Sequence, residues 1–166
     1  MRKVDVVVTG LQGCFGCLLS LIHLWGGDRE LFNEIELKYS PIQDTKVMPN
    51  AKIGIIEGAV GDNDQEETLK EMREKVDILI AVGTCAAYGG IAGLRNLFQV
   101  QDVLDRSYIE SESTKAGEIP GPPSLPELTN CIKPLSAFVE VDQNIPGCPP
   151  SDQLLKTIMQ ALQRGE

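Results

Sequence analysis

Short runs of apolar, mostly β-branched residues recur along this chain, and each ends near glycine or a polar residue. Such runs are typical of strands that are buried on both faces of a parallel sheet. They predict strands over Val4–Val8, Lys52–Ile56, Val76–Val82 and Phe138–Val141, and the alternating residues Ile35–Tyr39 predict an edge strand.

Stretches of helical character lie between these runs. They predict helices over Leu18–Trp25, Asp64–Lys75 and Ser151–Arg164. The second has acidic residues towards its start and Lys75 at its end, as the helix dipole favours, and Ser151 is placed to cap the third. Because strands and helices alternate, we expect an α/β fold with a doubly wound parallel sheet. The length of 166 residues fits a single domain, residues 1–166.

Two segments depart from this regular pattern. Residues Glu110 to Pro134 are rich in Ser, Gly and Pro and predict a long ordered or lid-like loop. The predicted helix Leu18–Trp25 is apolar nearly all round, which implies burial on two sides. A partner subunit would supply the second side, and so would a position wholly inside the chain's own domain.

Four cysteines follow the predicted strands. Cys14 and Cys17 come after the first strand, Cys85 after Val76–Val82, and Cys148 after Phe138–Val141. In parallel sheets of this kind, ligands collect beyond the carboxyl ends of the strands. We therefore expect the four thiols to meet at one edge of the sheet and to form a metal site.

The spacing of these cysteines bears on which metal they hold. Zinc ribbons bring their ligands as two close CxxC pairs, whereas here only Cys14 and Cys17 are paired. An iron–sulfur cluster spreads its thiolates over a larger polyhedron, in a glycine-rich setting such as this one. These features favour iron–sulfur over zinc without excluding zinc. Disulfides are disfavoured, because the five cysteines are odd in number and the chain reads as cytoplasmic.

Three further residues need an interpretation. Glu57 stands directly beyond a buried strand, where a carboxylate costs free energy unless it is paired or hydrogen-bonded, so it is a candidate for capping a helix, anchoring a partner or relaying protons. Cys131 is interpreted as a buried or half-buried thiol. His23, the only histidine, is interpreted as a packed core or interface residue rather than a ligand.

Charge and hydropathy restrict the partners. The net charge of −9 and the pI near 4.6 argue against binding of nucleic acid or of an anionic membrane surface. No apolar run is long enough for a membrane span, and the start of the sequence has no signal-peptide pattern. We expect a cytoplasmic protein whose partners are proteins or small molecules.

The motifs around these residues resemble those of the small subunit of [NiFe]-hydrogenases. The resemblance covers nearly the whole chain and rests on Cys14-Phe15-Gly16-Cys17, Glu57-Gly58, the stretch Gly83-Thr84-Cys85-Ala86-Ala87-Tyr88-Gly89-Gly90-Ile91, and Pro146-Gly147-Cys148-Pro149-Pro150. It implies a flavodoxin-like domain that carries one [4Fe–4S] cluster on Cys14, Cys17, Cys85 and Cys148. Glu57 matches a family glutamate near the large subunit, and the resemblance makes proton movement a candidate role for it.

The resemblance also implies partners. Short, single-cluster small subunits occur in cytoplasmic, NAD(P)-linked bidirectional hydrogenases. There, the chain would relay electrons between the NiFe centre of a large subunit and a separate iron–sulfur and flavin diaphorase module, so the catalytic centre is expected on a partner chain.

Three alternatives stay open at this point. The cluster-bearing subunit of the quinone-linked NADH dehydrogenase has the same fold, but it typically places two adjacent cysteines where this chain has Cys14 and Cys17. A hydrogen-sensing subunit without enzymatic activity would share all these features. FMN as the sole cofactor is disfavoured, because the loop Thr9 to Cys17 lacks the Ser and Thr run that would bind its phosphate; FMN beside a cluster is compatible with the sequence but not indicated by it.

Overall fold

Five parallel strands form the central sheet of the structure, a computed structural model that describes residues 3–123 and 125–164, with the backbone alone at 162–164. Along the sheet, the strands lie in the order β2, β1, β3, β5, β7, which is the flavodoxin-like order. Their bounds are β1 Val4–Gly10, β2 Ile35–Tyr39, β3 Ala51–Glu57, β5 Val76–Val82 and β7 Gln143–Ile145. A separate antiparallel pair joins β4, Val60–Asp62, to β6, Leu128–Lys133. The predicted α/β doubly wound fold is confirmed.

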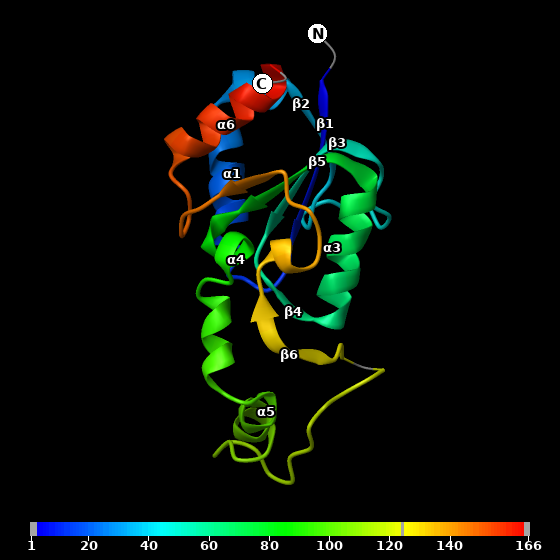
Figure 1. Ribbon diagram of the computed structural model, residues 1–166, viewed down its shortest axis with the longest axis vertical. Coiled ribbons are helices and arrows are strands. Elements are labelled where there is room, and N and C mark those ends of the chain that lie inside the picture. The colour runs from blue at the N-terminus through cyan, green and yellow to red at the C-terminus, as the bar shows by residue number, and fades with distance from the viewer. Residues whose placement is uncertain (1–2, 124, 165–166) are drawn as a thin grey trace.

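Helices cover both faces of this sheet. Figure 1 shows α1 and α6 on one face and α3 on the other, while β4, β6 and α5 lie beyond the carboxyl ends of the strands. The helices are α1 Gly16–Gly27, α2 Arg29–Asn33, α3 Asn63–Lys75, α4 Gly83–Tyr88, α5 Val100–Tyr108 and α6 Asp152–Arg164, with 3₁₀ turns η1 at Ala92–Leu97 and η2 at Leu135–Ala137. Within the described residues, no helix has the length and apolar character needed to cross a membrane.

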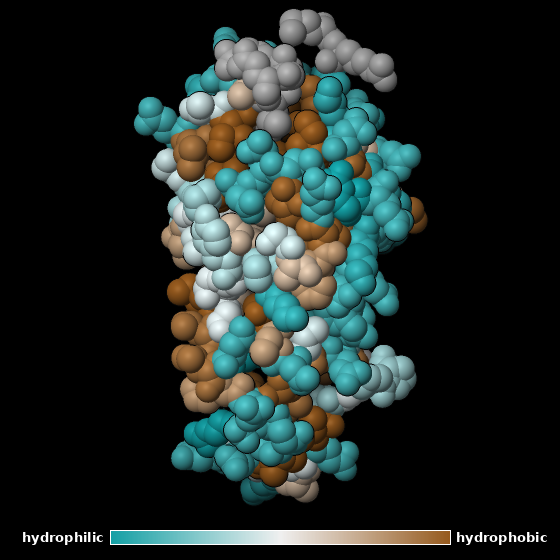
Figure 2. Space-filling model, viewed as in Figure 1, coloured by the Kyte–Doolittle hydropathy of each residue, from teal (hydrophilic) through white to brown (hydrophobic). Residues whose placement is uncertain are grey.

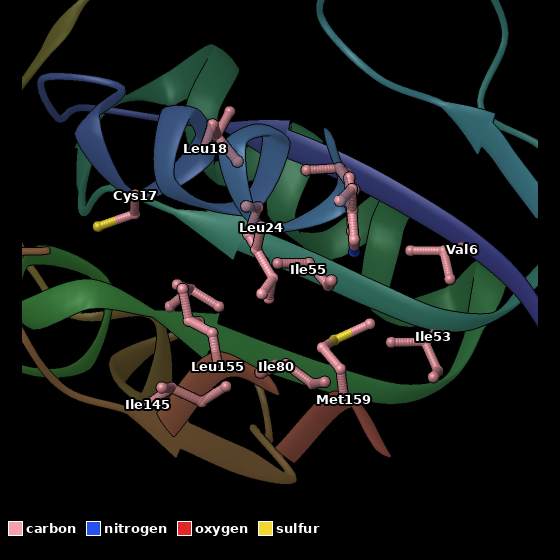
Figure 3. Close-up of a cluster of buried hydrophobic side chains, with 14 of the residues drawn as sticks. Val6, Cys17, Leu18, Leu24, Ile53, Ile55, Ile80, Ile145, Leu155 and Met159 are labelled. Atoms are coloured by element: carbon pink, nitrogen blue, oxygen red, sulfur yellow. The ribbon is translucent and has the colours of Figure 1, made fainter. Parts of the chain in front are cut away.

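The core consists of two apolar layers, one on each face of the sheet. Alternate strand residues point to opposite faces, so Val6 and Val8 join the layer under α1 and α6, while Val7 joins the layer under α3. Figure 3 shows the first layer, where Leu155 and Met159 of α6 face Ile80 of the sheet. Burial on both faces explains why these strands read as continuous apolar runs in the sequence.

The caps at the helix starts agree with their sequences. The side chain of Asp62 accepts a hydrogen bond from the backbone N–H of Gln65 at the start of α3, at 2.8 Å. The hydroxyl of Ser151 accepts one from the N–H of Leu154 at 3.4 Å, as predicted for the last helix.

The strand predicted at Phe138–Val141 is wrong, because the strand that pairs with β5 is β7. The N–H groups of Phe138 and Val139 instead donate to the carbonyl of Leu135 in a turn. The apolar side chains of this segment pack partly buried on the second core layer, so they satisfy the hydrophobic pattern without a ladder. Immediately afterwards, Asp142 ties the chain to β5: its N–H donates to the Leu79 carbonyl, and its carboxylate accepts from the Leu79 N–H at 2.7 Å.

The segment predicted as a long loop, Glu110 to Pro134, is only partly a loop. It ends in β6, which pairs with β4. The sequence analysis also did not predict α2, α4, η1 and α5. The first three are only five or six residues long, and α5 has no buried residue. The predicted boundaries of the domain, 1–166, extend past the described residues at both ends, and the division into one domain stays a prediction.

Replacement of Leu155 by Ala is expected to destabilise the fold by about 2–5 kcal/mol, because this side chain of α6 is fully buried in the first core layer. The neighbouring change Leu154→Ala is the matched control, since Leu154 is 38% exposed and should change stability by less than about 0.5 kcal/mol. Urea unfolding followed by circular dichroism measures both. Equal effects of the two changes would contradict the placement of α6.

The hydrogen bond between the Asp142 carboxylate and β5 should make the stability of the fold depend on pH. The Leu79 N–H, assisted by Arg73, holds the pKa of the Asp142 carboxyl below its ordinary value of 3.8, although partial burial opposes this. A carboxyl whose pKa is lower in the folded state stabilises the fold above its unfolded pKa, and this contribution is lost as the pH falls through the folded value. Urea unfolding should therefore show wild type more stable than Asp142→Asn at neutral pH, with the difference shrinking in acid. A difference independent of pH would contradict this.

Candidate metal centre

The loop after β1 carries the first two cysteines. Phe15 adopts a left-handed conformation with φ of 62° at the N-cap of α1, and the helix then begins at Gly16. This turn separates Cys14, which is exposed, from Cys17, which lies in the first helical turn and is buried. Cys14 is therefore open to solvent, whereas Cys17 borders the first core layer.

Glu57, the last residue of β3, holds this loop in place. Its carboxylate is only 2% exposed, and it accepts hydrogen bonds from the backbone N–H of Phe15 at 3.0 Å and of Cys17 at 3.3 Å. The first N–H groups of a helix have no partner within the helix, so a carboxylate is well suited to this position. The sequence marked Glu57 as a buried acid in need of partners, and the structure identifies these partners as the ligand loop itself.

Cys85 lies on α4, immediately beyond β5, and α4 begins against Cys17. Gly83 has φ of +90°, and a Cβ atom there would lie 2.4 Å from the Sγ of Cys17. Only glycine therefore allows the loop of Cys17 and the start of α4 to come this close. The third predicted ligand is thus brought beside the first pair.

The loop after β7 is joined to the same point by two hydrogen bonds. The N–H of Thr84 donates to the carbonyl of Gly147 at 2.8 Å, and the N–H of Gly147 donates to the hydroxyl of Thr84 at 3.2 Å. Cys148, the next residue, is exposed. Thr84 had no role in the sequence interpretation; its position between Gly83 and Cys85 is the signal that would have suggested one.

The surroundings of Cys17 disfavour its thiolate. Burial, followed by the negative charge of Glu57 and a hydrogen bond to it, raises the pKa of the Cys17 thiol to about 12, and the nearby Cys14 and Cys85 add to the shift. At neutral pH the thiol alone stays protonated. A metal ligand must be deprotonated, so this position is suited to a thiolate that a bound cation stabilises.

Cys14, Cys17, Cys85 and Cys148 are free thiols, which is the donor chemistry that an iron–sulfur cluster takes. Within the described part of the chain, no three His, Cys, Asp or Glu side chains are arranged to hold one metal ion. A cluster needs its thiolates further apart than one ion does, and it needs backbone close by, as at Gly83. The chemistry of the donors, four cysteines from three adjoining loops, matches that need.

The interpretation of Cys131 as a buried or half-buried thiol is wrong. Cys131 lies on β6 and is exposed, and it is distant in sequence and in a different sheet from the strands that precede the other four cysteines. For His23, the core alternative is wrong, because the residue is exposed on α1, and a place at an interface stays a prediction. Both residues sit in apolar or β-branched sequence surroundings, which predict burial of the segment but do not fix which face each side chain takes.

Known proteins resemble this chain over nearly its whole length. The family of the NADH ubiquinone oxidoreductase 20 kDa subunit matches residues 14–162. The chain belongs to this family. Within it, the chain is of the hydrogenase small-subunit type, and three relatives support this.

The first relative is a subunit of the F420-non-reducing hydrogenase vhu of Methanocaldococcus jannaschii, 39% identical over 98% of this chain and 57% of the relative. The chain thus spans little more than half the length of that protein. The NAD-reducing hydrogenase HoxS subunit delta of Cupriavidus necator is 35% identical over 98% of this chain and 80% of the relative. A chain of an NAD⁺-reducing [NiFe]-hydrogenase, solved in the H₂-reduced state, matches with a TM-score of 0.93 and 31% identity, covering 99% of this chain and 93% of that one.

Replacement of Glu57 by Ala should loosen the ligand loop, because the N–H groups of Phe15 and Cys17 lose their acceptor. Each buried donor left without a partner costs about 1–3 kcal/mol. Amide hydrogen exchange measured by NMR should accelerate at Phe15 and Cys17, whereas Glu57→Gln, which keeps one acceptor oxygen, should have a smaller effect. Unchanged exchange at both amides in Glu57→Ala would show that the carboxylate does not hold the loop.

Proposed function

We propose that this chain is the electron-transfer small subunit of a cytoplasmic [NiFe]-hydrogenase, and that Cys14, Cys17, Cys85 and Cys148 hold one [4Fe–4S] cluster. The observation that carries this proposal is the meeting of the three cysteine-bearing loops at the carboxyl edge of the sheet, through Gly83 and the Thr84–Gly147 hydrogen bonds. Similarity to NAD-reducing hydrogenase chains over nearly the whole length supports it.

The residues around the site have separate tasks in this proposal. When bound, a cluster of this kind accepts and releases one electron at a time. Glu57 fixes the conformation of the loop Cys14–Cys17 through two backbone N–H groups, and Gly83 lets α4 approach that loop. Thr84 fixes the third loop. We assign no residue of this chain to the splitting of H₂, because the proposed NiFe centre lies on a partner subunit. Proton relay by Glu57 stays a prediction.

An exposed apolar strip beside the site supports the presence of a partner subunit. It comprises large side chains of α4, η1 and the residues next to them, namely Tyr88, Ile91, Leu94, Leu97 and Phe98. Figure 2 shows apolar atoms gathered along this edge of the molecule, over the segment between α4 and α5. Monomeric proteins rarely expose such a continuous strip.

The low charge of the segment that contains this strip also supports a partner subunit there. In a chain of net charge −9, the residues from Ile78 to Gln101 include no acid and a single cation, Arg95. The guanidinium of Arg95 is turned inwards, to the carbonyls of Gly61 and Thr129. The strip starts three residues after Cys85, so a subunit that covers it also shields the site from water. A large NiFe-bearing subunit fits this place, and an iron–sulfur and flavin diaphorase module would be the second partner.

The second candidate function is that of the cluster-bearing subunit of a quinone-linked NADH dehydrogenase, because the matching family carries the name of such a subunit. The spacing of Cys14 and Cys17 argues against this candidate. Subunits of the quinone-linked type typically have two adjacent cysteines at this place, whereas two residues separate the cysteines in this chain. Nickel in the partner separates the two candidates.

Cys85→Ser is expected to abolish the electron-relay role, since it removes one of the proposed ligands. In the complex purified without oxygen from the native host, wild type should contain about four iron and four sulfide per copy of this chain, and nickel in a partner chain. Cys85→Ser should lose the low-temperature paramagnetic signal of the reduced cluster and H₂-dependent reduction of NAD(P).

The matched control is Cys131→Ser, which removes the exposed fifth cysteine on β6 and should leave metal content, signal and activity unchanged. Full H₂-dependent NAD(P) reduction by Cys85→Ser would overturn the relay assignment. Iron and sulfide without nickel would transfer the assignment to the quinone-linked class, and zinc alone would refute a redox role.

A further inference from the structure

Helix α1 has more apolar surface than the fold buries. Leu18, Leu21, Leu24 and Trp25 pack into the first core layer, which accounts for one side of the helix. On the other side, Leu19 is 64% exposed and Ile22 is exposed as well. Burial within the chain therefore satisfies only half of the all-round apolar pattern.

The exposed side of α1 lines a groove. Its other walls come from α2 and from the segment after β2, and the cavity has a volume of about 480 Å³. Its floor and rim are almost wholly apolar, with five large exposed side chains: Phe15, Leu19, Ile22, Phe32 and Ile42. A groove of this composition is the usual seat of an amphipathic segment of another chain, which inserts bulky side chains at spaced positions.

One charged side chain restricts the occupant. Among the residues that the structure describes, Arg29 is the only charged one that lines the groove and no carboxylate lines it, although the chain carries a net charge of −9. Among the described residues, Arg29 forms no salt bridge, whereas the neighbouring Asp28 pairs with Lys156 at 2.7 Å. An unpaired guanidinium at the rim of an apolar groove is complementary to a carboxylate on the incoming segment.

The groove is also physically continuous with the candidate metal centre. Phe15 stands between Cys14 and Cys17, lines the groove, and donates its N–H to Glu57. Its ring lies so close to Gly10 that a Cβ there would be 2.7 Å from the ring. A side chain that enters the groove and presses on Phe15 therefore acts on the loop that carries two of the cysteines.

We propose that this groove binds an apolar segment of a partner subunit, with bulky aliphatic or aromatic side chains and one carboxylate that meets Arg29. It is a separate surface from the apolar strip after Cys85, so the chain has one docking face on α1 and another on η1. The binding itself follows from the groove alone. Only its effect on the cluster rests on the proposed function.

The test uses the complex purified from the native host, with the photoreactive residue benzoylphenylalanine in place of Ile42. Ile42 is 72% exposed at the groove, and Val47, 73% exposed but outside the groove, is the matched position for a control. Irradiation should join position 42, but not position 47, to one segment of a single partner subunit. Mass spectrometry of the joined peptide should identify bulky apolar residues and at least one Asp or Glu.

Substitutions measure the strength of the contact. Ile42→Glu and Arg29→Glu should each lower the amount of that partner in the purified complex by about tenfold, which corresponds to about 1.4 kcal/mol. Val47→Glu should leave the amount unchanged. Arg29→Lys, which keeps the positive charge but not the planar fork of donors, should lower the amount less than Arg29→Glu does. The loss of the partner in Ile42→Glu should alter the paramagnetic spectrum of the reduced cluster without changing iron content.

Several results would overturn the proposal. They are a cross-link from position 42 to a second copy of this chain, an apolar small molecule released from wild type but not from Ile42→Glu, a cross-linked segment without a carboxylate, and full retention of every subunit in Ile42→Glu. A cross-link of the expected kind, in a complex whose copy of this chain holds no iron or sulfide, would refute the proposed function and leave the docking surface intact.

Discussion

The organisation of the site depends on one buried carboxylate. Glu57 ends β3 inside the molecule, where an unpaired charge would be strongly unfavourable, and its two oxygens instead accept the N–H groups of Phe15 and Cys17. These are N–H groups that the start of α1 cannot satisfy within the helix. The N–H groups thus compensate the buried negative charge, and the carboxylate supplies the acceptors that the first turn of the helix lacks. Together with the β-bridge between Gln12 and Ala59, these hydrogen bonds fix the conformation of the loop between β1 and α1.

Parallel topology explains why so much of this site could be predicted from the sequence. Once β1, β3, β5 and β7 run in one direction, the residues that follow them must meet at one edge, whatever the lengths of the helices between them. On this ground the sequence predicts that Cys14, Cys85 and Cys148 lie at the same edge of the sheet, and the hydrogen bonds among their loops agree with this. The strand order itself, with β4 and β6 set apart in a second sheet, was not predictable, because β4 is only three residues long and only one of the six residues of β6 is buried.

The errors have a common physical origin. Apolar patterns report that a segment needs burial, but they do not report how its backbone hydrogen bonds are satisfied. Phe138 to Val141 is apolar because it packs on the core, yet its N–H groups turn back to Leu135 and the ladder begins only at Gln143. Likewise, His23 lies within an apolar helix but on the face that the core does not reach. Pairing of backbone groups depends on neighbours distant in sequence, so it becomes visible only in three dimensions.

The distribution of apolar surface distinguishes this chain from a self-sufficient flavodoxin-like protein. The two core layers are fully formed, so the exposed residues on α1 and η1 are not a sign of a core too small to fold. They form two separate surfaces, and each starts within three residues of a cysteine of the site: Phe15 adjoins Cys14, and Tyr88 follows Cys85. A cofactor that only stabilised the fold would need no such surfaces. The proposed function gives them a role: a cofactor that passes electrons between two other chains needs a close neighbour on each side, and exposed apolar surface next to the cysteine-bearing loops provides free energy for that contact.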